Sequence, residues 1–461
     1  MARENTRTGG KPATEAIVPG DVCISIGKPP KKAPPGYEWR ALTSVARLET
    51  GHTPSRKRPE YWGGEVPWIG IRDATGNHGR VIHATNENTN ALGISNSSAR
   101  ILPAETVCLS RTASVGYVVV MGRPMATSQD FVNWVCSDEL NPHYLKYALL
   151  SEQRALRMFA VGSVHSTIYF PEVKAFHLCM PSRKVQDAVA ATLGALDDKI
   201  ELNRRMNATL EAMARALFQS WFVDFDPVRA KLDPDRSGPP LDPATAALFP
   251  EHLEDSPLGH IPKGWEVCSL ANKIELLSGG TPKTSEPDYW DGDIPWYSVK
   301  DAPSETDVWV IQTEKQVTKL GIENSAAQVL PEGTTIISAR GTVGKLALVG
   351  TPMAMNQSCY GVRGAKGYAD YFTYFALRQA TADLQQRTHG TVFDTITRQT
   401  FETLDCIFPP APLTQAFDRT VTPLLAQIRA NLHQSRTLAT LRDTLLPKLL
   451  SGELRPSSEA E

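Results

Sequence analysis

The sequence predicts an α+β protein built as a tandem duplication, in which a β-rich domain followed by a long helix occurs twice. Two observations predict this fold. The octapeptide YWGGEVPW at residues 61–68 returns as YWDGDIPW at residues 289–296, and each β-rich stretch precedes a segment with a heptad pattern of apolar side chains. The two helices are expected to pack against each other as an antiparallel coiled coil.

The repeat extends far beyond the octapeptide. An offset of 228 residues aligns the two halves from residue 51 to about 222 with almost no gap. Thr53 recurs as Thr281 and Gln129 recurs as Gln357, each within a longer matching stretch. A repeat of this length is too long for a solenoid unit and is typical of a duplicated domain with an appended element.

The β-rich domains are expected at residues 35–182 and 262–410. Short β-branched runs such as TVCLS, GYVVV and TTIIS, separated by Gly- and Pro-containing turns, predict strands. Each domain also holds one helical segment near its end, HYLKYALLSEQRALRMF in the first and YFTYFALRQATADLQQ in the second. The front of each half is therefore mixed, with strands dominating.

The long helices are expected at residues 183–225 and 411–453, because Pro and Gly become scarce there and apolar residues follow a 4–3 spacing. A rod of about 40 residues is roughly 60 Å long. Pro423 is expected to bend the second helix or to delay the start of its straight part. Residues 226–261 form a Pro- and Asp-rich linker, residues 1–34 an extension expected to be largely disordered, and residues 454–461 a tail.

The candidate positions of the helix–helix seam and partner interface share the heptad spacing or directly follow it. They are Leu196, Ile200, Asn203, Leu210, Trp221, Phe222, Phe225, Leu424, Ile428, Asn431, Leu438, Leu445 and Leu449. Asn203 and Asn431 occupy equivalent positions, where a polar residue either fixes the register of the two helices or faces solvent. The aromatic end at Trp221, Phe222 and Phe225 either contacts a partner or caps the local core.

Composition limits the classes of function. The chain of 461 residues has a formal charge of −2, and no apolar run or N-terminal block is suited to a membrane span or a secretory signal. Seven scattered cysteines without C-x-x-C spacing indicate reduced thiols in a cytoplasmic protein. Residues 36–182 hold 14 basic and 12 acidic side chains, and residues 262–409 hold 13 and 17. This balance gives no support by itself for tight DNA binding.

Several long strings resemble the specificity (S) subunit of type I restriction-modification enzymes. They are ALFQSWFVDFDPVRAK at 216–231, ALFPEHLEDSPLGHIPKGWEV at 247–267 and LLPKLLSGEL at 445–454, together with the paired GHTP/SGGTP and octapeptide blocks. The resemblance covers about residues 35–455. It implies that the β-rich domains are two target-recognition domains, each recognising one half of a bipartite DNA site, and that the helices form the spacer between them.

The resemblance also implies the partners. They are double-stranded DNA, methyltransferase (M) subunits in two copies, and restriction (R) subunits, with no membrane. Catalysis belongs to those subunits, so the chain itself is expected to be non-catalytic and to hold no cofactor or metal, with S-adenosylmethionine, ATP and Mg²⁺ on the partner subunits.

The residues agree with a chain that lacks catalytic machinery. Asn141-Pro142-His143 has only one proline and no aromatic residue where a methyltransferase site needs them. Gly341-Thr342-Val343-Gly344-Lys345 has the wrong glycine spacing for a phosphate-binding loop. Glu172 and Lys174, a possible nuclease pair, become Thr400 and Glu402 in the second half. No His or Cys cluster has metal-ligand spacing.

Candidate DNA-binding residues come from polar segments that differ between the halves, because direct recognition of bases needs Arg, Lys, Asn, Gln, Glu or Asp at base edges. In the first half they are Arg56, Lys57, Arg72, Arg111, Thr112, Ser163, His165 and Ser166; in the second they are Lys283, Lys300, Arg340, Lys345, Thr391 and Asp394. Each segment is alternatively a solvated turn or a bend required by the fold.

The leading hypothesis is therefore a DNA sequence-specificity subunit that docks methyltransferase and restriction subunits. The alternatives are an interaction scaffold with degenerate recognition domains, the specificity subunit of a methylation-only system, and an enzyme in its own right. The small cationic excess predicts weak DNA binding by the isolated chain.

Overall fold

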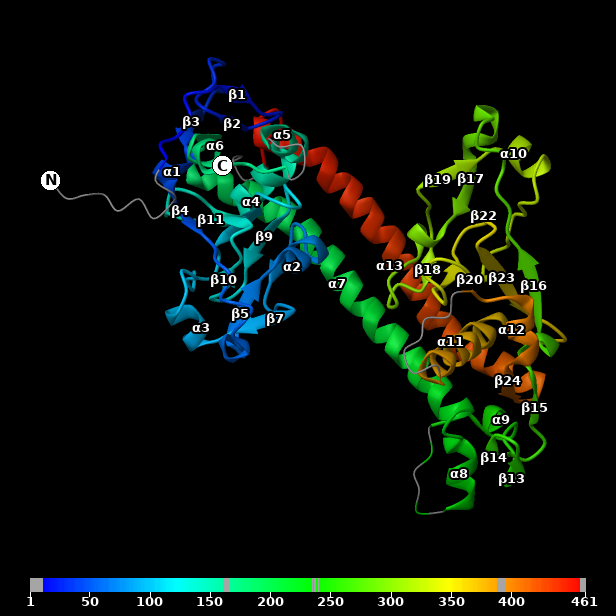
Figure 1. The fold of residues 1–461 in the computed structure, drawn as a ribbon. Helices are drawn as coiled ribbons and strands as arrows, with labels where there is room; N and C mark the ends of the chain where they lie inside the picture. Colours follow the sequence, from blue (N-terminus) through cyan, green and yellow to red (C-terminus); the bar gives the residue numbers. More distant parts are fainter. Residues whose placement is uncertain are drawn as a thin grey trace. The chain divides into compact units, whose positions relative to one another are not determined.

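The computed structural model describes residues 11–160, 166–233, 235, 238, 240–387 and 395–456. The chain divides into two compact units: unit 1 comprises residues 1–198 and 438–461, and unit 2 comprises residues 199–437 (Figure 1). Each unit holds one of the two β-rich domains and parts of both long helices, and each is described by itself. No helix in the described ranges is long and apolar enough to cross a membrane.

The described part of unit 1 contains three sheets with strand orders β4-β11-β8-β9-β6, β10-β5-β7 and β1-β2-β12-β3. The expected runs TVCLS and GYVVV supply β8 and β9, which are fully buried. The strands are β1 (Val18–Pro19), β2 (Ile24–Ile26), β3 (Tyr37–Ala41), β4 (Ala46–Thr50), β5 (Trp62–Ile69), β6 (Val81–Ile82), β7 (Glu87–Thr89), β8 (Val107–Ser110), β9 (Val118–Met121), β10 (Ala126–Thr127), β11 (Phe131–Cys136) and β12 (Phe176–Pro181).

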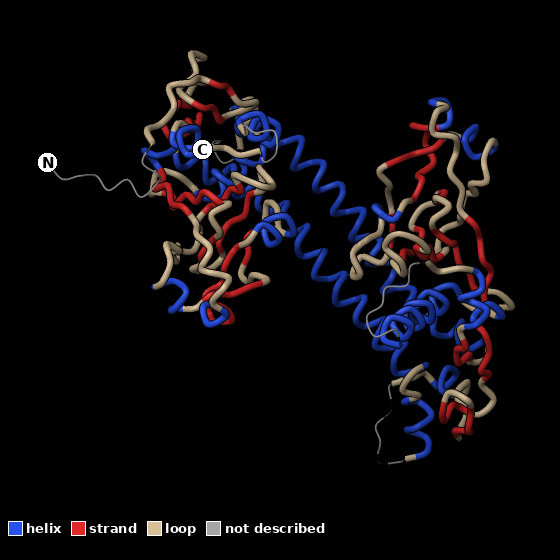
Figure 2. The backbone as a smooth tube through the Cα atoms, viewed as in Figure 1, coloured by secondary structure: helices blue, strands red, loops and turns tan. Residues whose placement is uncertain are grey.

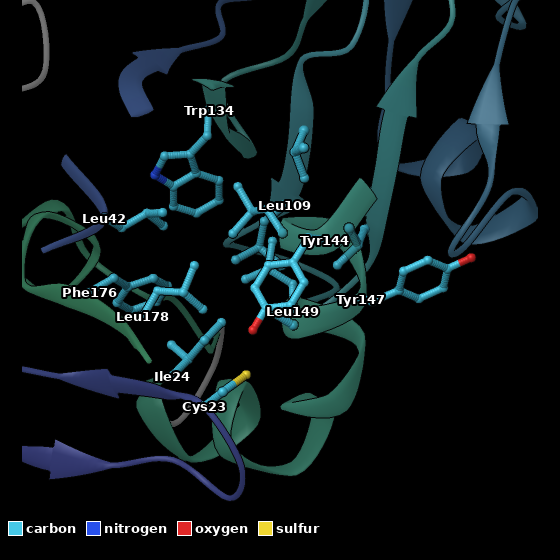
Figure 3. Packing of buried hydrophobic residues seen from close by; sticks show 14 of the residues in the cluster. Cys23, Ile24, Leu42, Leu109, Trp134, Tyr144, Tyr147, Leu149, Phe176 and Leu178 are labelled. Carbon is cyan, nitrogen blue, oxygen red and sulfur yellow. The ribbon is translucent and has the colours of Figure 1, made fainter. Parts of the chain in front are cut away.

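The short helices of unit 1 cover these sheets. Asn141 starts the main one, because its side chain accepts the N–H groups of the first turn and Pro142 follows it at a position that needs no N–H. Trp134 and Phe176 stack at 6.1 Å in the core (Figure 3). The helices are α1 (Leu42–Val45), η1 (Pro59–Tyr61), α2 (Ile71–Gly76), α3 (Ala91–Ser95), α4 (Pro142–Ser151), α5 (Gln153–Phe159) and α6 (Phe170–Lys174).

Unit 2 repeats this plan with strand orders β16-β23-β20-β21-β18 and β19-β17-β22, and adds the two-stranded sheets β15-β24 and β13-β14. The parallel pairing of Trp68 with Ala126 in unit 1 returns as that of Trp296 with Ala354. The strands are β13 (Leu253–Ser256), β14 (Gly259–Pro262), β15 (Glu266–Ser269), β16 (Ile274–Ser278), β17 (Trp290–Tyr297), β18 (Trp309–Val310), β19 (Lys315–Val317), β20 (Thr335–Ser338), β21 (Leu346–Val349), β22 (Ala354–Met355), β23 (Cys359–Gly364) and β24 (Asp405–Phe408).

The expected linker at 226–261 is more structured than its composition indicates. It contains two short helices and the β13–β14 hairpin, and it buries Phe249 and Ile261 in the core of unit 2. The helices of this unit are α8 (Asp226–Leu232), α9 (Pro243–Ala246), η2 (Leu270–Asn272), η3 (Pro287–Tyr289), η4 (Val299–Asp301), α10 (Lys319–Glu323), α11 (Asp370–Arg387) and α12 (Arg398–Thr403).

The two long helices are α7 (Arg183–Phe222) and α13 (Ala411–Ser451), seen as the longest helical tubes in Figure 2. In unit 1, Val189 near the start of α7 shares a core cluster with Leu450 near the end of α13. In unit 2, Trp221 at the end of α7 shares a cluster with Phe417 near the start of α13. The helices therefore pack antiparallel, which confirms the predicted fold class.

The helix α13 runs through Pro423 without a break, and a bend at this residue stays a prediction. Pro423 lies on the exposed side of the helix, as does Arg419, whose carbonyl loses the N–H that a proline cannot supply. Water can satisfy that carbonyl, so the helix loses one hydrogen bond without leaving a buried polar group unpaired.

The expectation of a largely disordered N-terminal extension is also wrong for the described residues 11–34. Strand β2 pairs with β12, and Cys23, Ile24 and Ile26 are at most 3% exposed. These residues complete the four-stranded sheet and the core of unit 1, so burial of apolar surface orders a segment whose overall composition is polar.

The two predicted polar seam positions are both buried in unit 2. Asn203 donates through Nδ2 to Gln434 Oε1 at 2.9 Å and to Ser435 Oγ at 3.1 Å. Asn431 donates through Nδ2 to Asn207 Oδ1 at 2.9 Å. The solvent-facing alternative is therefore excluded for both residues, while their role in fixing the register stays a prediction.

Candidate nucleic-acid interface

Each unit contains a tight turn with a buried serine, here called the serine turn, at residues 110–117 in unit 1 and 338–345 in unit 2. Ser110 Oγ donates to a carbonyl within the turn at 2.5 Å and accepts an N–H of the turn at 2.8 Å. Ser338 makes the same two bonds at the same distances. Both serines are fully buried, so the two turns have one internal frame.

In both units the third residue after the buried serine lies in the left-handed backbone region. It is Gly341 in unit 2, with φ 78°, and Ala113 in unit 1, with φ 62°. An alanine in this region carries a cost of order 1 kcal/mol that glycine avoids. The turn geometry is therefore retained in unit 1 although its sequence is less suited to it.

Arg111 in the serine turn of unit 1 is held within the protein. Its guanidinium lies 4.5 Å from the ring centre of Phe170, and Nη2 donates to the carbonyl of Gln129 at 3.2 Å. Burial lowers the pKa of Arg111 below its usual value. Nε is buried without a hydrogen-bond partner among the described residues. Much of the Arg111 side chain, which was predicted to bind DNA, is therefore packed against its own unit.

Arg340 in unit 2 is exposed, and its side chain forms no hydrogen bond or ion pair within the described part of the chain. It is equivalent to Thr112 and not to Arg111, so the two arginines are one position apart in the shared frame. Successive residues of an extended segment point to opposite faces, and the shift by one residue therefore turns the arginine from the interior toward solvent.

The predicted DNA-binding residues Thr112 and Ser166 lie close together in unit 1. Thr112 Oγ1 lies 2.8 Å from Thr167 Oγ1, and the exposed Ser166 directly precedes that residue. Arg340 forms the equivalent backbone bridge to Thr395 in unit 2. Four predicted candidates lie outside the described residues: Ser163, His165, Thr391 and Asp394.

Arg56, another predicted DNA-binding residue, is held by side chains of its own unit. Its two terminal nitrogens donate to the Glu87 carboxylate at 2.5 and 2.8 Å, and its guanidinium lies 3.8 Å from Trp62 and 4.9 Å from Trp68. The hydrogen bonds from Arg56 hold the pKa of Glu87 below its usual range. The half-exposed arginine is therefore already paired, whereas the neighbouring Lys57 is exposed without an ion pair in the described ranges.

The equivalent segment of unit 2 uses a different cation. Lys283 pairs with Glu286 at 2.8 Å, and Lys315 lies 5.5 Å from the ring centre of Trp290. Lys315 was not predicted, because its position relative to Trp290 depends on strand pairing that the repeat alone does not specify. The remaining predicted cations are all exposed and form no ion pair among the described residues; they are Arg72, Lys300 and Lys345.

The predicted seam residues differ in their burial. Ile428 and Leu449 are buried in the cores of their units. The half-buried members, which a pair of helices can cover only on one side, are Leu196, Ile200, Leu210, Leu424, Leu438 and Leu445. Leu202, which the heptad pattern places outside the seam, is 43% exposed and lines an apolar groove on α7 together with Met206 and Leu210.

The aromatic end of α7 is not available to a partner. Trp221, Phe222 and Phe225 are between 1% and 6% exposed. Phe222 contacts Phe372 and Phe417 with ring centres 4.9 and 5.2 Å apart. The partner-contact interpretation of these three residues is therefore corrected to the alternative, in which they form the core of unit 2.

The chain matches the family model "Type I restriction modification DNA specificity domain" over residues 34–212 and 262–431. It is similar to the type I restriction enzyme MjaIX specificity subunit of Methanocaldococcus jannaschii, with 28% identity over 93% of this chain and 95% of that protein. It is also similar to the HindI specificity subunit of Haemophilus influenzae, with 26% identity over 72% of this chain and 84% of that protein.

A crystal structure of the type I restriction-modification S subunit from M. genitalium has the same fold, with a TM-score of 0.52, 17% identity and coverage of 91% of this chain and 98% of that one. The two family matches cover the two β-rich domains and the first parts of α7 and α13. The chain belongs to the type I restriction-modification DNA specificity family and is a specificity subunit of such a system.

Proposed function

We propose that the chain binds a bipartite duplex DNA target, with the serine-turn face of unit 1 at one half-site and that of unit 2 at the other. Methyltransferase subunits, in two copies, and restriction subunits dock on it in the cytoplasm. They supply the methylation and cleavage chemistry with S-adenosylmethionine, ATP and Mg²⁺, while this chain supplies the sequence preference.

The observation that carries this proposal is one backbone frame with two different polar surfaces. The serine turns have equal internal bonds, yet Arg340 is exposed in unit 2 where unit 1 has Thr112. A guanidinium on such a turn can donate two hydrogen bonds to a guanine edge in the major groove, and a threonine cannot. The duplicated frame therefore presents two different chemistries for base recognition.

Exposed cations of the two units are suited to phosphate contacts, and one of them, Lys345, lies in the serine turn of unit 2. They are Lys57 and Arg72 in unit 1 and Lys300 and Lys345 in unit 2. Phosphate contacts fix the register of a protein on DNA, but four such contacts give only modest affinity at physiological salt. We therefore expect weak binding by the isolated chain and tight binding once methyltransferase subunits contribute their own contacts.

The apolar groove on α7 is the surface that we assign to a methyltransferase subunit. Leu202 is 43% exposed, and Met206 and Leu210 extend the apolar surface along the same helix. Methionine side chains adapt to different partner shapes, and a groove of this kind suits a partner helix with apolar anchors.

Co-expression with the cognate methyltransferase, followed by sequencing for modified bases, tests the proposal. A bipartite methylated motif supports it, and a chain that assembles without producing any motif would instead be an interaction scaffold. Methylation by the chain alone would identify an enzyme and overturn the assignment of catalysis to the partners. Restriction of unmodified phage DNA separates a complete system from one that only methylates.

A further inference from the structure

Residues 11–28 form a segment, here called the N-terminal strap, that lies against the recognition domain of unit 1. Its strand β2 adds to β12, and Cys23 and Ile24 are each 1% exposed. Figure 3 shows both side chains within the same cluster as Tyr144 and Leu178. The strap is therefore an integral part of the unit, although it has no counterpart in the repeat.

Glu152 anchors the strap. Its carboxylate is fully buried and accepts the backbone N–H groups of four successive strap residues, Asp21, Val22, Cys23 and Ile24, at 2.6, 2.8, 2.6 and 2.9 Å. No lysine or arginine in the described ranges forms an ion pair with it. A buried carboxylate without a counter-charge requires such hydrogen bonds, so the carboxylate and the strap stabilise each other.

The helical segment that contains Glu152 is interrupted at this residue. In unit 2, α11 runs unbroken from Asp370 to Arg387, whereas the equivalent segment of unit 1 is divided at Glu152 into α4 and α5. The residue equivalent to Glu152 is Ala380, a strong helix former that makes no such hydrogen bonds. Unit 2 also lacks a strand equivalent to β2, because its described β24 pairs only with β15.

Other residues of the strap are hydrogen-bonded to α6, the helix next to the serine turn of unit 1. The N–H of Thr14 donates to the carbonyl of Pro171 at 3.0 Å, and the N–H of Gly27 donates to that of Ala175 at 2.8 Å. Lys174 Nζ donates to the carbonyl of Lys11 at 2.7 Å. Three hydrogen bonds, made at separate points along the strap, therefore join it to α6 and to the residue that follows this helix.

Helix α6 in turn supports the predicted DNA-binding turn of unit 1. Phe170, its first residue, lies under the guanidinium of Arg111 at 4.5 Å. Just before the helix, the N–H of Ile168 donates to the carbonyl of Arg111 at 2.8 Å, and Thr167 bonds Thr112. A displacement of α6 would therefore move both Arg111 and Thr112.

We propose that Glu152 is a positioning residue for DNA recognition by unit 1, acting through the strap and α6 on Arg111 and Thr112. The inference rests on the proposed function. It assigns to the N-terminal strap a role in one half-site only, because unit 2 has Ala380 at the equivalent position and no equivalent strand among its described residues.

The test is a graded series at the anchor in the full chain, co-expressed with its methyltransferase. Glu152→Gln keeps Oε1, which accepts three of the four N–H groups, and Glu152→Ala removes all four bonds. Gly20→Ala is an independent perturbation from the strap side, because a Cβ there would lie 2.7 Å from Glu152 Oε2 and 2.1 Å from the Ile24 carbonyl oxygen. Glu139→Gln is the matched control, since it removes an exposed carboxylate that pairs with Arg40 in the same unit.

Two quantities are measured for each variant. Hydrogen exchange of residues 21–24 should accelerate in the order Glu, Gln, Ala, by about tenfold to a hundredfold for Ala. Sequencing of modified bases should show that methylation at sites with a changed base in the unit 1 half-site rises about tenfold relative to the full motif, while the other half-site stays as strict as in the wild type. Arg340→Ala, which alters unit 2, identifies the other half-site.

The outcomes are distinguishable. Accelerated exchange with an unchanged unit 1 half-site would overturn the positioning role and leave the strap as a structural element only. Equal loss of both half-sites would indicate general destabilisation and would also overturn it. A wild-type chain without any bipartite motif refutes the proposed function instead, and in that case the exchange series still measures the anchor itself.

Discussion

The ion cluster around Asp197 allows the cost of removing one buried charge to be estimated in unit 1. Asp197 accepts hydrogen bonds from Tyr147 Oη at 2.6 Å, Arg442 Nη1 at 2.8 Å and Lys146 Nζ at 3.2 Å. These bonds connect α4, α7 and α13. Burial opposes the charge on Asp197, but Lys146, Tyr147 and Arg442 outweigh it and hold its pKa below the usual range. Burial lowers the pKa of Lys146, whose side chain is 5% exposed.

Asp197→Ala would leave the Lys146 ammonium buried without a counter-charge, and breaking a buried pair in this way costs about 3–5 kcal/mol. Removing the polar set together should cost far less. The triple variant Lys146→Met, Tyr147→Phe and Asp197→Leu replaces the members on α4 and α7 by apolar groups. Arg442, whose side chain is 29% exposed, keeps its ion pair with Asp443. This variant is expected to lie within about 1 kcal/mol of the wild type or to stabilise the unit. Unit 2 has Tyr374, Phe375 and Leu425 buried at the three equivalent positions, so no lysine–aspartate pair is buried there.

Native-state hydrogen exchange of the α4 amides measures the local free energy of opening in each variant. Asp198→Ala is the control, because it removes the neighbouring carboxylate, which is exposed. A cost under about 1 kcal/mol for Asp197→Ala, or an equal loss of stability in the triple variant, would contradict this estimate. Because the pKa of Asp197 is lowered, its contribution is present above the unfolded value of 3.8 and is lost as pH falls below it.

Three further predictions concern unit 2 and the partner groove. Burial raises the pKa of Asp418 to about 7, so its protonated form is favoured and the stability of unit 2 should fall as pH rises from 3.8 through about 7. Asp418→Asn should remove this slope in denaturant titrations at several pH values, and an unchanged slope would contradict the assignment. Arg340→Ala should relax base preference by about 1–3 kcal/mol in the unit 2 half-site alone, measured by methylation of mismatched sites. Met206→Glu should weaken co-purification of the methyltransferase, whereas Thr192→Glu, an exposed change elsewhere on α7, should not; equal effects would refute the groove assignment.

Much of the fold follows from short-range patterns in the sequence. The strands come from β-branched runs, and the heptad spacing gives the antiparallel helices, because these patterns directly express the 2-residue and 3.5-residue periods of the two structures. The strap was missed for the opposite reason. Glu152 binds residues about 130 positions away, and neither the polar composition of residues 1–34 nor the repeat carries that information. The one available signal was Ala380 at the equivalent position of the second half.

The candidate site was predicted as segments, but the direction of its side chains was not. Arg111 and Arg340 both follow a serine-containing strand, and they look interchangeable in an approximate alignment. The structure places them on opposite faces, because they are one residue apart in the shared frame. The offset of 228 aligns Arg340 with Thr112, but the alignment alone does not say which of two neighbouring positions faces solvent. The clamp on Arg56 could not be inferred, because it needs the pairing of β5 with β7 that brings Glu87 close.

A comparison of the two units shows which residues the backbone of the serine turn retains and which of its surroundings differ. Both units retain the buried serine of the turn, and both retain a tryptophan whose Nε1 donates to a backbone carbonyl at 3.0–3.1 Å. The elements that pack behind this frame differ between the units. Unit 1 has the ion cluster around Asp197 and a helical segment that is interrupted at Glu152. Unit 2 has aromatic packing and the continuous helix α11. Because unlike supports hold the same turn, its surface residues can change without changing the frame. A protein that recognises two different half-sites with one duplicated domain needs this independence, and single residues exchanged between the units should therefore transfer base preference only when they lie on the turn itself.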